Sequence, residues 1–428
     1  MSETAGLRLA GVAGLVAALC LSSVASAEGT DKSVPHTGFW DGKLWLKSRY
    51  RYEEVDQAGF AENARASTIG VRPGIESGIF HGFRVGVEAD LIGEIGPDDF
   101  NNRINGKVQY PVVVDVESVE LNQAYIQSHH VPGVVITGGR YTQDLDNWRF
   151  IGQVIWRQNN QTFDGAKVEV TSIPGVEIYY GYIGNVNTIF SDDGPDSAPT
   201  DGNLSSNIHN VNVKANLPAS LGVLAGYTYL MDIQDLDALS NATYGGFIEG
   251  KQKIFRGVTF NYRIEYAHQT DYGDQPIGYS ADYWHLQPGV TVGGFTTTLG
   301  YEKLGSDGGL IGFQTPLATA HKFNGFADVF LATPATGLKD FYVDLTYKAK
   351  GLPAQFSFFE GLLITAQYHE FRSDVGDADF GHEFDLYVRQ PLKAYEGLAV
   401  DFKFTGYDGG SAGFADRDKY ILGITYGY

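Results

Sequence analysis

The chain has 428 residues and a formal net charge of −20, which argues against nucleic acid as a partner, because phosphates attract a basic surface. Only 43% of the residues are hydrophobic, and beyond residue 21 no apolar run approaches the roughly 18 residues of a membrane-spanning helix, so a polytopic helical membrane protein is excluded. A single Cys rules out a disulfide framework, while 54 Gly, 26 Tyr and 26 Phe favour β structure.

The first segment has the features of an export signal. Arg8 precedes an apolar run over residues 9–21, and the small residues Ala25 and Ala27 fit a cleavage site. We predict that residues 1–27 are a cleaved signal peptide. An N-terminal membrane anchor is the alternative, but the run is short for a span and ends in small residues.

Alternation of apolar and polar residues runs through the rest of the chain, as expected for strands with one apolar and one polar face. It is clear over residues 43–53, 83–92, 258–266 and 398–405. Most segments have about nine to eleven residues, the length of a tilted strand that crosses a bilayer. We predict eighteen strands, which begin near Lys43, Arg65, Phe83, Glu117, Val134, Thr162, Val176, Ile208, Val223, Thr243, Val258, Tyr279, Phe295, Phe341, Leu362, His382, Leu398 and Lys419.

The connections alternate between short turns and long polar loops. Residues 77–82, 172–175, 217–222 and 288–294 predict short turns, whereas residues 93–115, 185–207 and 305–339 predict long loops. Short periplasmic turns and long outer loops are typical of outer-membrane barrels. The sequence therefore predicts an all-β fold, a transmembrane antiparallel β-barrel of about 18 strands over residues 28–428.

A soluble, secreted all-β protein is the alternative fold. The polar faces carry Arg, Lys, Glu and Asp in nearly every strand, which is too much charge for a closed soluble core. The apolar faces carry Tyr and Phe near the strand ends, as the aromatic girdles of membrane barrels do. Both observations favour the membrane barrel.

Alternation continues to the last residue of the sequence. Tyr420, Leu422, Ile424, Tyr426 and Tyr428 share one face. A strand of this kind that ends on an aromatic residue resembles the final strand of bacterial outer-membrane proteins, which serves as an assembly signal. We expect the barrel-assembly machinery of a Gram-negative cell to be a partner through this strand.

Several segments of the chain resemble the alginate-export family of outer-membrane porins. They include Arg49-Tyr50-Arg51-Tyr52-Glu53, Glu120-Leu121-Asn122-Gln123-Ala124-Tyr125 and Gly139-Arg140, and, more specifically, residues 145–152, 156–164 and 313–331. The resemblance covers residues 43–428 and implies an 18-stranded barrel with solute passage through an arginine-lined lumen. It does not fix the solute, and Tyr141-Thr142 stands where the family often has Gln-Arg.

Arginines on the polar faces are candidates for lining the pore, because guanidinium groups bind carboxylates and phosphates bidentately. The alternative is that they pair with carboxylates of the same strands, such as Glu53, Glu88, Asp90 and Glu265, and so brace the wall. The predicted pore-lining or solute-binding residues are Arg49, Arg51, Arg72, Arg84, Arg140, Arg157, Arg263, His321, Lys322 and Arg389.

Two segments without alternation are candidates for a constriction. Residues 314–331 lie in the longest loop, and loops of this length are usually functional or disordered. We expect this segment to fold into the mouth or lumen and to present His321 and Lys322 to the solute. In the loop over residues 148–160, Trp156 and Arg157 could stack on and hydrogen-bond a sugar or carboxylate. Loop packing that merely caps the barrel is the alternative for both.

Enzymatic function has weak support in the sequence. Residues 409–413 match the nucleophile-elbow string Gly-X-Ser-X-Gly, but they join two predicted strands instead of opening a helix. Glu383 and Asp385 share a face but lie in a charged wall with Arg389. An outer-membrane hydrolase and a structural or adhesive barrel remain the alternatives to a porin.

The sequence thus predicts a porin of the outer membrane that lets small hydrophilic, anionic solutes pass down their gradient. Carboxylates or acidic sugars, including alginate-like ones, are the expected class of solute, and outer-membrane lipid surrounds the barrel. We expect no cofactor, no metal and no catalytic residue.

Overall fold

The computed structural model describes residues 37–192, 202–218 and 221–427. Within these residues eighteen strands form one antiparallel sheet in which each strand pairs with its neighbours in the chain. The last strand pairs with the first, from Ser48 opposite Tyr426 to Gln57 opposite Arg417, so the sheet closes on itself. The predicted signal peptide, residues 1–27, and the terminal Tyr428 lie outside the described residues.

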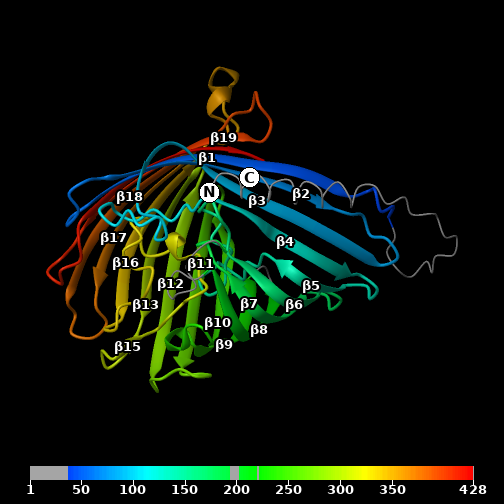
Figure 1. The fold of residues 1–428 in the computed structure, drawn as a ribbon, viewed down its shortest axis with the longest axis horizontal. Coiled ribbons are helices and arrows are strands. Elements are labelled where there is room, and N and C mark those ends of the chain that lie inside the picture. Colours follow the sequence, from blue (N-terminus) through cyan, green and yellow to red (C-terminus); the bar gives the residue numbers. More distant parts are fainter. Residues whose placement is uncertain (1–36, 193–201, 219–220, 428) are drawn as a thin grey trace.

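The strands of the barrel follow one another around the wall, from blue to red in Figure 1. They are β1 (Lys43–Gln57), β2 (Ala64–Glu76), β3 (Phe83–Asp99), β4 (Ser118–Ser128), β5 (Val134–Tyr141), β6 (Thr162–Val170), β7 (Val176–Asn187), β8 (Asn203–Leu217), β9 (Gly222–Ile233), β10 (Asn241–Phe255), β11 (Val258–Thr270), β12 (Ser280–Val292), β13 (Phe295–Leu304), β16 (Leu338–Lys348), β17 (Leu363–Arg372), β18 (Asp379–Pro391), β19 (Leu398–Asp408) and β20 (Arg417–Tyr426).

The prediction of an all-β barrel of about eighteen strands is confirmed, and each predicted segment coincides with one of these strands. The long loop between β13 and β16 also contains elements that the alternation did not predict. They are the short hairpin β14 (Ser306–Asp307) and β15 (Ile311–Gly312) and the 3-10 helix η3 (Ala320–Lys322). The other short helices are η2 (Asp237–Leu239) and η4 (Ala354–Phe359).

Alternation gives the wall an apolar outer face and a polar inner face. On β1, Leu44 and Leu46 are exposed outside, whereas Arg51 and Glu53 are buried inside. Aromatic residues are exposed toward both ends of the outer face, with Phe255 and Phe295 at one end and Trp284 at the other. This is the distribution expected for a barrel wall between two membrane interfaces.

The two ends of the barrel differ in the length of their connections. One end has short turns, among them residues 256–257 between β10 and β11 and residues 293–294 between β12 and β13. The turn that contains η4, residues 349–362, is longer and projects beyond the strands (orange in Figure 1). The opposite end has the long loops, of which residues 142–161 and 305–337 shape the lumen.

No helix in the described part of the chain is long and apolar enough to span a membrane. The main apolar core lies inside the barrel, where the long loops pack against the inner wall. Phe150 lies at its centre, 5.2 Å from the ring of Tyr227, 5.6 Å from that of Tyr283 and 6.1 Å from that of Phe313. Inward folding of the loops therefore buries aromatic surface as well as polar groups.

Candidate functional site

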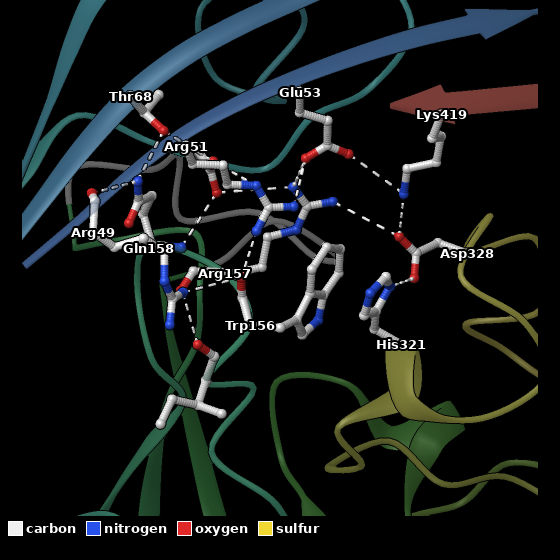
Figure 2. A network of polar contacts seen from close by, with 12 residues as sticks. Arg49, Arg51, Glu53, Thr68, Trp156, Arg157, Gln158, His321, Asp328 and Lys419 are labelled. Atoms are coloured by element: carbon white, nitrogen blue, oxygen red, sulfur yellow. Dashed lines mark hydrogen bonds and ion pairs between the residues drawn. The ribbon is translucent and has the colours of Figure 1, made fainter. Parts of the chain in front are cut away.

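The loop over residues 142–161 is tied to the inner wall by arginines that donate to its carbonyl groups. Arg49 Nη1 donates to the carbonyls of Ile155, Trp156 and Arg157 at 2.9, 3.1 and 3.0 Å. Arg51 donates to the carbonyl of Trp156, and Arg72 of β2 donates to that of Gln158. Figure 2 shows Arg49 and Arg51 beside the loop residues Trp156, Arg157 and Gln158. The arginines thus satisfy backbone acceptors that the loop exposes inside the barrel.

Glu53 is a carboxylate of β1 that pairs with three cations (Figure 2). It lies 2.6 Å from Arg51, 3.0 Å from Arg157 and 3.4 Å from Lys419 of β20, and its side chain is fully buried. Asp115 is a second buried carboxylate of the group, 3.7 Å from Arg51 and 3.8 Å from Arg157. Buried charges of opposite sign therefore fix the loop to the wall. Removal of one of these groups would leave a buried partner without its compensating charge.

The loop over residues 305–337 is tied to the wall by carboxylates as well as by cations. Arg417 donates to the carbonyl of Ala327 at 2.7 Å, and Lys419 donates to that of Phe326 at 3.3 Å. The backbone N–H of Ala327 donates to Glu383 at 2.7 Å, and that of Phe326 donates to Asp385 at 3.2 Å. The side-chain amide of Asn324 donates to Glu302 at 2.7 Å and to Asp340 at 3.1 Å. The expectation that residues 314–331 fold into the lumen is confirmed by these contacts.

The two loops also bind each other inside the barrel. The N–H of Gly152 donates to the carbonyl of Leu317 at 2.9 Å. The rings of Trp156 and His321 stack with 3.4 Å between centroids and an angle of 11°. Trp156 is also surrounded by cations, with Arg157 at 4.0 Å and Arg51 at 4.7 Å from its ring. Trp156 is therefore held rigidly at the contact between the loops.

His321 links the loop to Lys403 of β19. Its Nδ1 lies 2.8 Å from Asp328 and its Nε2 lies 2.7 Å from Lys403 Nζ. Burial and the positive charge of Lys403 lower the pKa of His321 well below its ordinary value. A neutral ring with the proton on Nδ1 donates to Asp328 and accepts from Lys403, which fits both neighbours. Burial opposes ionisation of Asp328, but Lys419 and His321 hold its pKa well below its ordinary value.

Lys403 differs from the arginines in its partners. Among the described residues no carboxylate lies within 4.0 Å of its ammonium group, which contacts His321 and lies 4.6 Å from the ring of Phe326. A pocket of about 120 Å³ opens beside it, on the side of the short turns. The pocket is lined by Arg49, Arg51, Trp156, Tyr387, Arg389, Asp401, Lys403, Ile421, Gly423 and Thr425.

A larger cavity of about 570 Å³ lies on the other side of Trp156, toward the long loops. Its wall is largely apolar, with Phe60, Val112 and Leu236 among its residues, and it reaches Arg417 and Lys419. Trp156 borders both cavities. Because this ring borders both cavities, Trp156 and its neighbours are the candidate constriction.

The predicted pore-lining residues divide into two groups. Arg49, Arg51, Arg157, His321 and Arg389 lie around Trp156, and Arg72 lies beside them. The others lie elsewhere: Arg84 is 3.5 Å from Glu76, Arg140 pairs with Asp164 at 2.7 Å, Arg263 pairs with Glu249 at 2.6 Å, and Lys322 donates to the carbonyl of Asn147 at 3.0 Å.

Two expectations about individual side chains are wrong. His321 is not presented to solute: its exposed fraction is 3%, because Trp156 and Phe326 stack on it from the two loops. Arg157 is not available to bind a sugar or carboxylate, because it is buried against Glu53 and Asp115. For these two residues, packing of the loops against each other and the wall, which was the alternative for both segments, describes the structure.

Lys403, Lys419 and Asp328 were not among the predicted site residues. Alternation does place Lys403 and Lys419 on the polar faces of their strands, so that signal was present. Asp328 has a positive φ of 60° within the loop, and nothing in its local sequence indicates that it meets Lys419 at 2.5 Å.

The carboxylates that were considered for catalysis are engaged with the loop. Glu383 accepts from Ala327 and from the hydroxyl of Thr405 at 2.7 Å, and both Glu383 and Asp385 are buried. Residues 409–416 join β19 to β20 as a hairpin loop, as expected. Within the described residues no group of three or more His, Cys, Asp or Glu could hold a metal ion.

A closed antiparallel barrel of this size, with an apolar outer face and loops folded into its lumen, has the architecture of outer-membrane β-barrels. Solved structures share the fold. OccK1 (OpdK) of Pseudomonas aeruginosa superposes with a TM-score of 0.71 at 16% identity, over 91% of this chain and 99% of that chain. The same protein with vanillate gives the same values. OccAB4 of Acinetobacter baumannii gives a TM-score of 0.67 at 14% identity, over 90% and 97%.

Sequence comparison adds no closer relationship. No protein-family model and no curated protein sequence matches the chain. The likeness to the solved structures therefore establishes the fold, and the function follows from the site.

Proposed function

We propose that this protein is an outer-membrane channel through which small hydrophilic anions, chiefly carboxylates, diffuse down their gradient. The observation that supports it most is the pocket beside Trp156, where Lys403 has no carboxylate partner among the described residues. Arg389 borders the same pocket with 28% of its side chain exposed, although it also pairs with Asp401 at 3.3 Å. Cations that narrow a water-filled passage favour anions in it.

The cavity on the loop side suggests the form of the solute. Its apolar wall suits a hydrocarbon or aromatic body, and the exposed Arg103, which also lines it, suits a carboxylate. Vanillate, found with the similarly folded OpdK, combines an aromatic ring with a carboxylate. The resemblance to the alginate-export family adds acidic sugars to the proposed class, because a uronate carries the same charged group.

The proposed location and processing follow from the same reasoning. An apolar outer face with aromatic residues toward both ends fits an outer membrane, with the long loops outside and the short turns in the periplasm. Export through the signal peptide over residues 1–27 and assembly through the C-terminal strand belong to this proposal.

Uptake into proteoliposomes tests the proposed function. A labelled aromatic carboxylate and its neutral amide have the same size, so the comparison isolates charge. We expect the carboxylate to enter faster than the amide with wild-type protein, and the difference to shrink with Lys403→Met. Equal entry of both compounds, or no entry above protein-free vesicles, would contradict the proposal.

A further inference from the structure

Another pocket of the lumen, of about 580 Å³, lies on the inner wall of β9 to β13, at the end with the short turns. It is formed by other strands than the pocket beside Trp156, whose wall belongs to β1 and β18 to β20. Asn261 of β11 is opposite Lys251 on one side and Gly289 on the other, and Gly289 is opposite Thr298 of β13. Because Gly289 has no side chain, the wall is hollowed between its polar neighbours.

Two amide side chains of the lining use their nitrogen within the wall. The amide of Asn261 donates to the hydroxyl of Thr291 at 2.9 Å, and that of Gln287 donates to the hydroxyl of Tyr342 at 3.1 Å. Neither amide oxygen has a hydrogen-bond donor among the described residues. Each oxygen can therefore accept a hydrogen bond from a solute.

The charged residues of the lining leave one more acceptor and one cation. Glu249 accepts from Arg263 at 2.6 Å through Oε2, 46% of its side chain is exposed, and its Oε1 has no donor in the described part of the chain. Arg263 also pairs with the buried Glu265 at 2.8 Å, so two carboxylates share its charge. Lys251 is exposed, and no described carboxylate lies within 4.0 Å of its ammonium group.

This combination of groups distinguishes between classes of carboxylate. Three acceptor oxygens need donors, which the hydroxyl groups of a polyhydroxylated solute supply, and the ammonium group of Lys251 suits a carboxylate. An acid without hydroxyl groups would displace water from the three oxygens without replacing its hydrogen bonds. The pocket therefore favours an acid that carries several hydroxyl groups.

We propose that the pocket is a binding site for a small open-chain polyhydroxy acid, which donates to Asn261, Gln287 and Glu249 and binds Lys251 through its carboxylate. The inference rests on the proposed function, which admits such solutes to the lumen. It adds a site at the short-turn end that recognises a solute by its hydroxyl groups, whereas the residues around Trp156 recognise charge.

Block of the channel current by gluconate in a planar bilayer tests the proposal. Hexanoate has the same number of carbon atoms and the same charge but no hydroxyl groups, and sorbitol has hydroxyl groups but no charge. Asn261→Leu and Gln287→Met each remove an acceptor oxygen at nearly constant volume. Gln367→Met is the matched control, because Gln367 also lies on the inner face, donates to Asp344 at 2.9 Å and does not line the pocket.

We expect gluconate to halve the wild-type current at an about tenfold lower concentration than hexanoate or sorbitol. Each pocket variant should raise this gluconate concentration about three- to tenfold without weakening the block by hexanoate, whereas Gln367→Met should behave like wild type. Equal block by gluconate and hexanoate, or wild-type block in both pocket variants, would overturn the proposal.

Saturation-transfer NMR of gluconate with the detergent-purified barrel separates this inference from the proposed function, because it detects binding without conduction. Binding that is lost in Asn261→Leu, in a barrel that does not conduct, would contradict only the channel. A conducting, anion-selective channel to which gluconate does not bind would contradict only this site.

Discussion

The two inward loops enter the same lumen but are held by different sets of wall charges: arginines bind the carbonyls of the first loop, whereas carboxylates and cations together bind the backbone of the second. Wall arginines donate to the carbonyls of residues 155–158, whereas wall carboxylates accept from the N–H groups of residues 326 and 327. A loop without regular structure exposes both kinds of backbone group, and each must find a partner when it is buried. Most of the charge on the lumen wall near the constriction therefore positions loops. Of the remaining charges, Lys403 and Arg389 border the pocket beside Trp156.

Removal of the central carboxylate should disturb the cation-held loop most. Glu53→Gln leaves Arg51, Arg157 and Lys419 with less compensating charge in a buried site. We expect a loss of about 3–5 kcal/mol in the free energy of unfolding, measured by urea titration of the folded barrel in detergent. Conductance should rise and fluctuate as residues 142–161 leave the wall.

The matched control for this variant is Glu370→Gln, whose carboxylate pairs with Arg372 at 2.8 Å in an exposed position. It should change neither stability nor conductance, because exposed ion pairs contribute little. If Glu53→Gln behaved like Glu370→Gln, the network would not be what holds the loop.

Truncation of the anionic anchor should have a smaller effect. Glu383→Ala leaves the N–H of Ala327 and the hydroxyl of Thr405 without their acceptor, but Asp385 still accepts from Phe326. We expect a loss of about 1–3 kcal/mol and more frequent current fluctuations in single-channel records. Quiet records at wild-type stability would mean that the other contacts of the second loop hold it without Glu383.

The smallest expected effect is the pH dependence of His321. Its pKa is lowered in the folded protein, so the unfolded chain binds a proton first as the pH falls. Stability should therefore decrease below about pH 6.5, the ordinary histidine value. His321→Gln removes this contribution, and the difference between unfolding free energies at pH 7 and pH 5 should be smaller than in wild type. If the two proteins showed the same difference, the pKa of His321 would not be lowered in the folded state.

The barrel could be predicted from the sequence because the alternation within each strand separates its apolar face from its polar face. Lys43–Gln57 shows this, since its alternation separates Leu44 from Arg51 without knowledge of any other strand. Inward folding of residues 314–331 was also predictable, because the segment lacks alternation and is too long for a simple connection.

The partners inside the lumen could not be predicted. Glu53 of β1 meets Arg157 across 104 positions of sequence, and only the inward folding of the loop over residues 142–161 brings them together. His321 was expected to face solute because it lies in a polar loop, but Trp156 from the other loop covers it. These contacts between residues far apart in the sequence decide which arginines brace the loops and which face solute.

The reversal potential of the channel in a planar bilayer under a potassium chloride gradient tests the central claim most directly. We predict anion selectivity for wild type and a several-fold loss of it in Lys403→Met, which keeps most of the side-chain volume and removes a charge that has no carboxylate partner among the described residues. Lys214→Met, whose lysine pairs with Asp146 at 2.8 Å, should leave the selectivity unchanged. A cation-selective wild type would contradict the account.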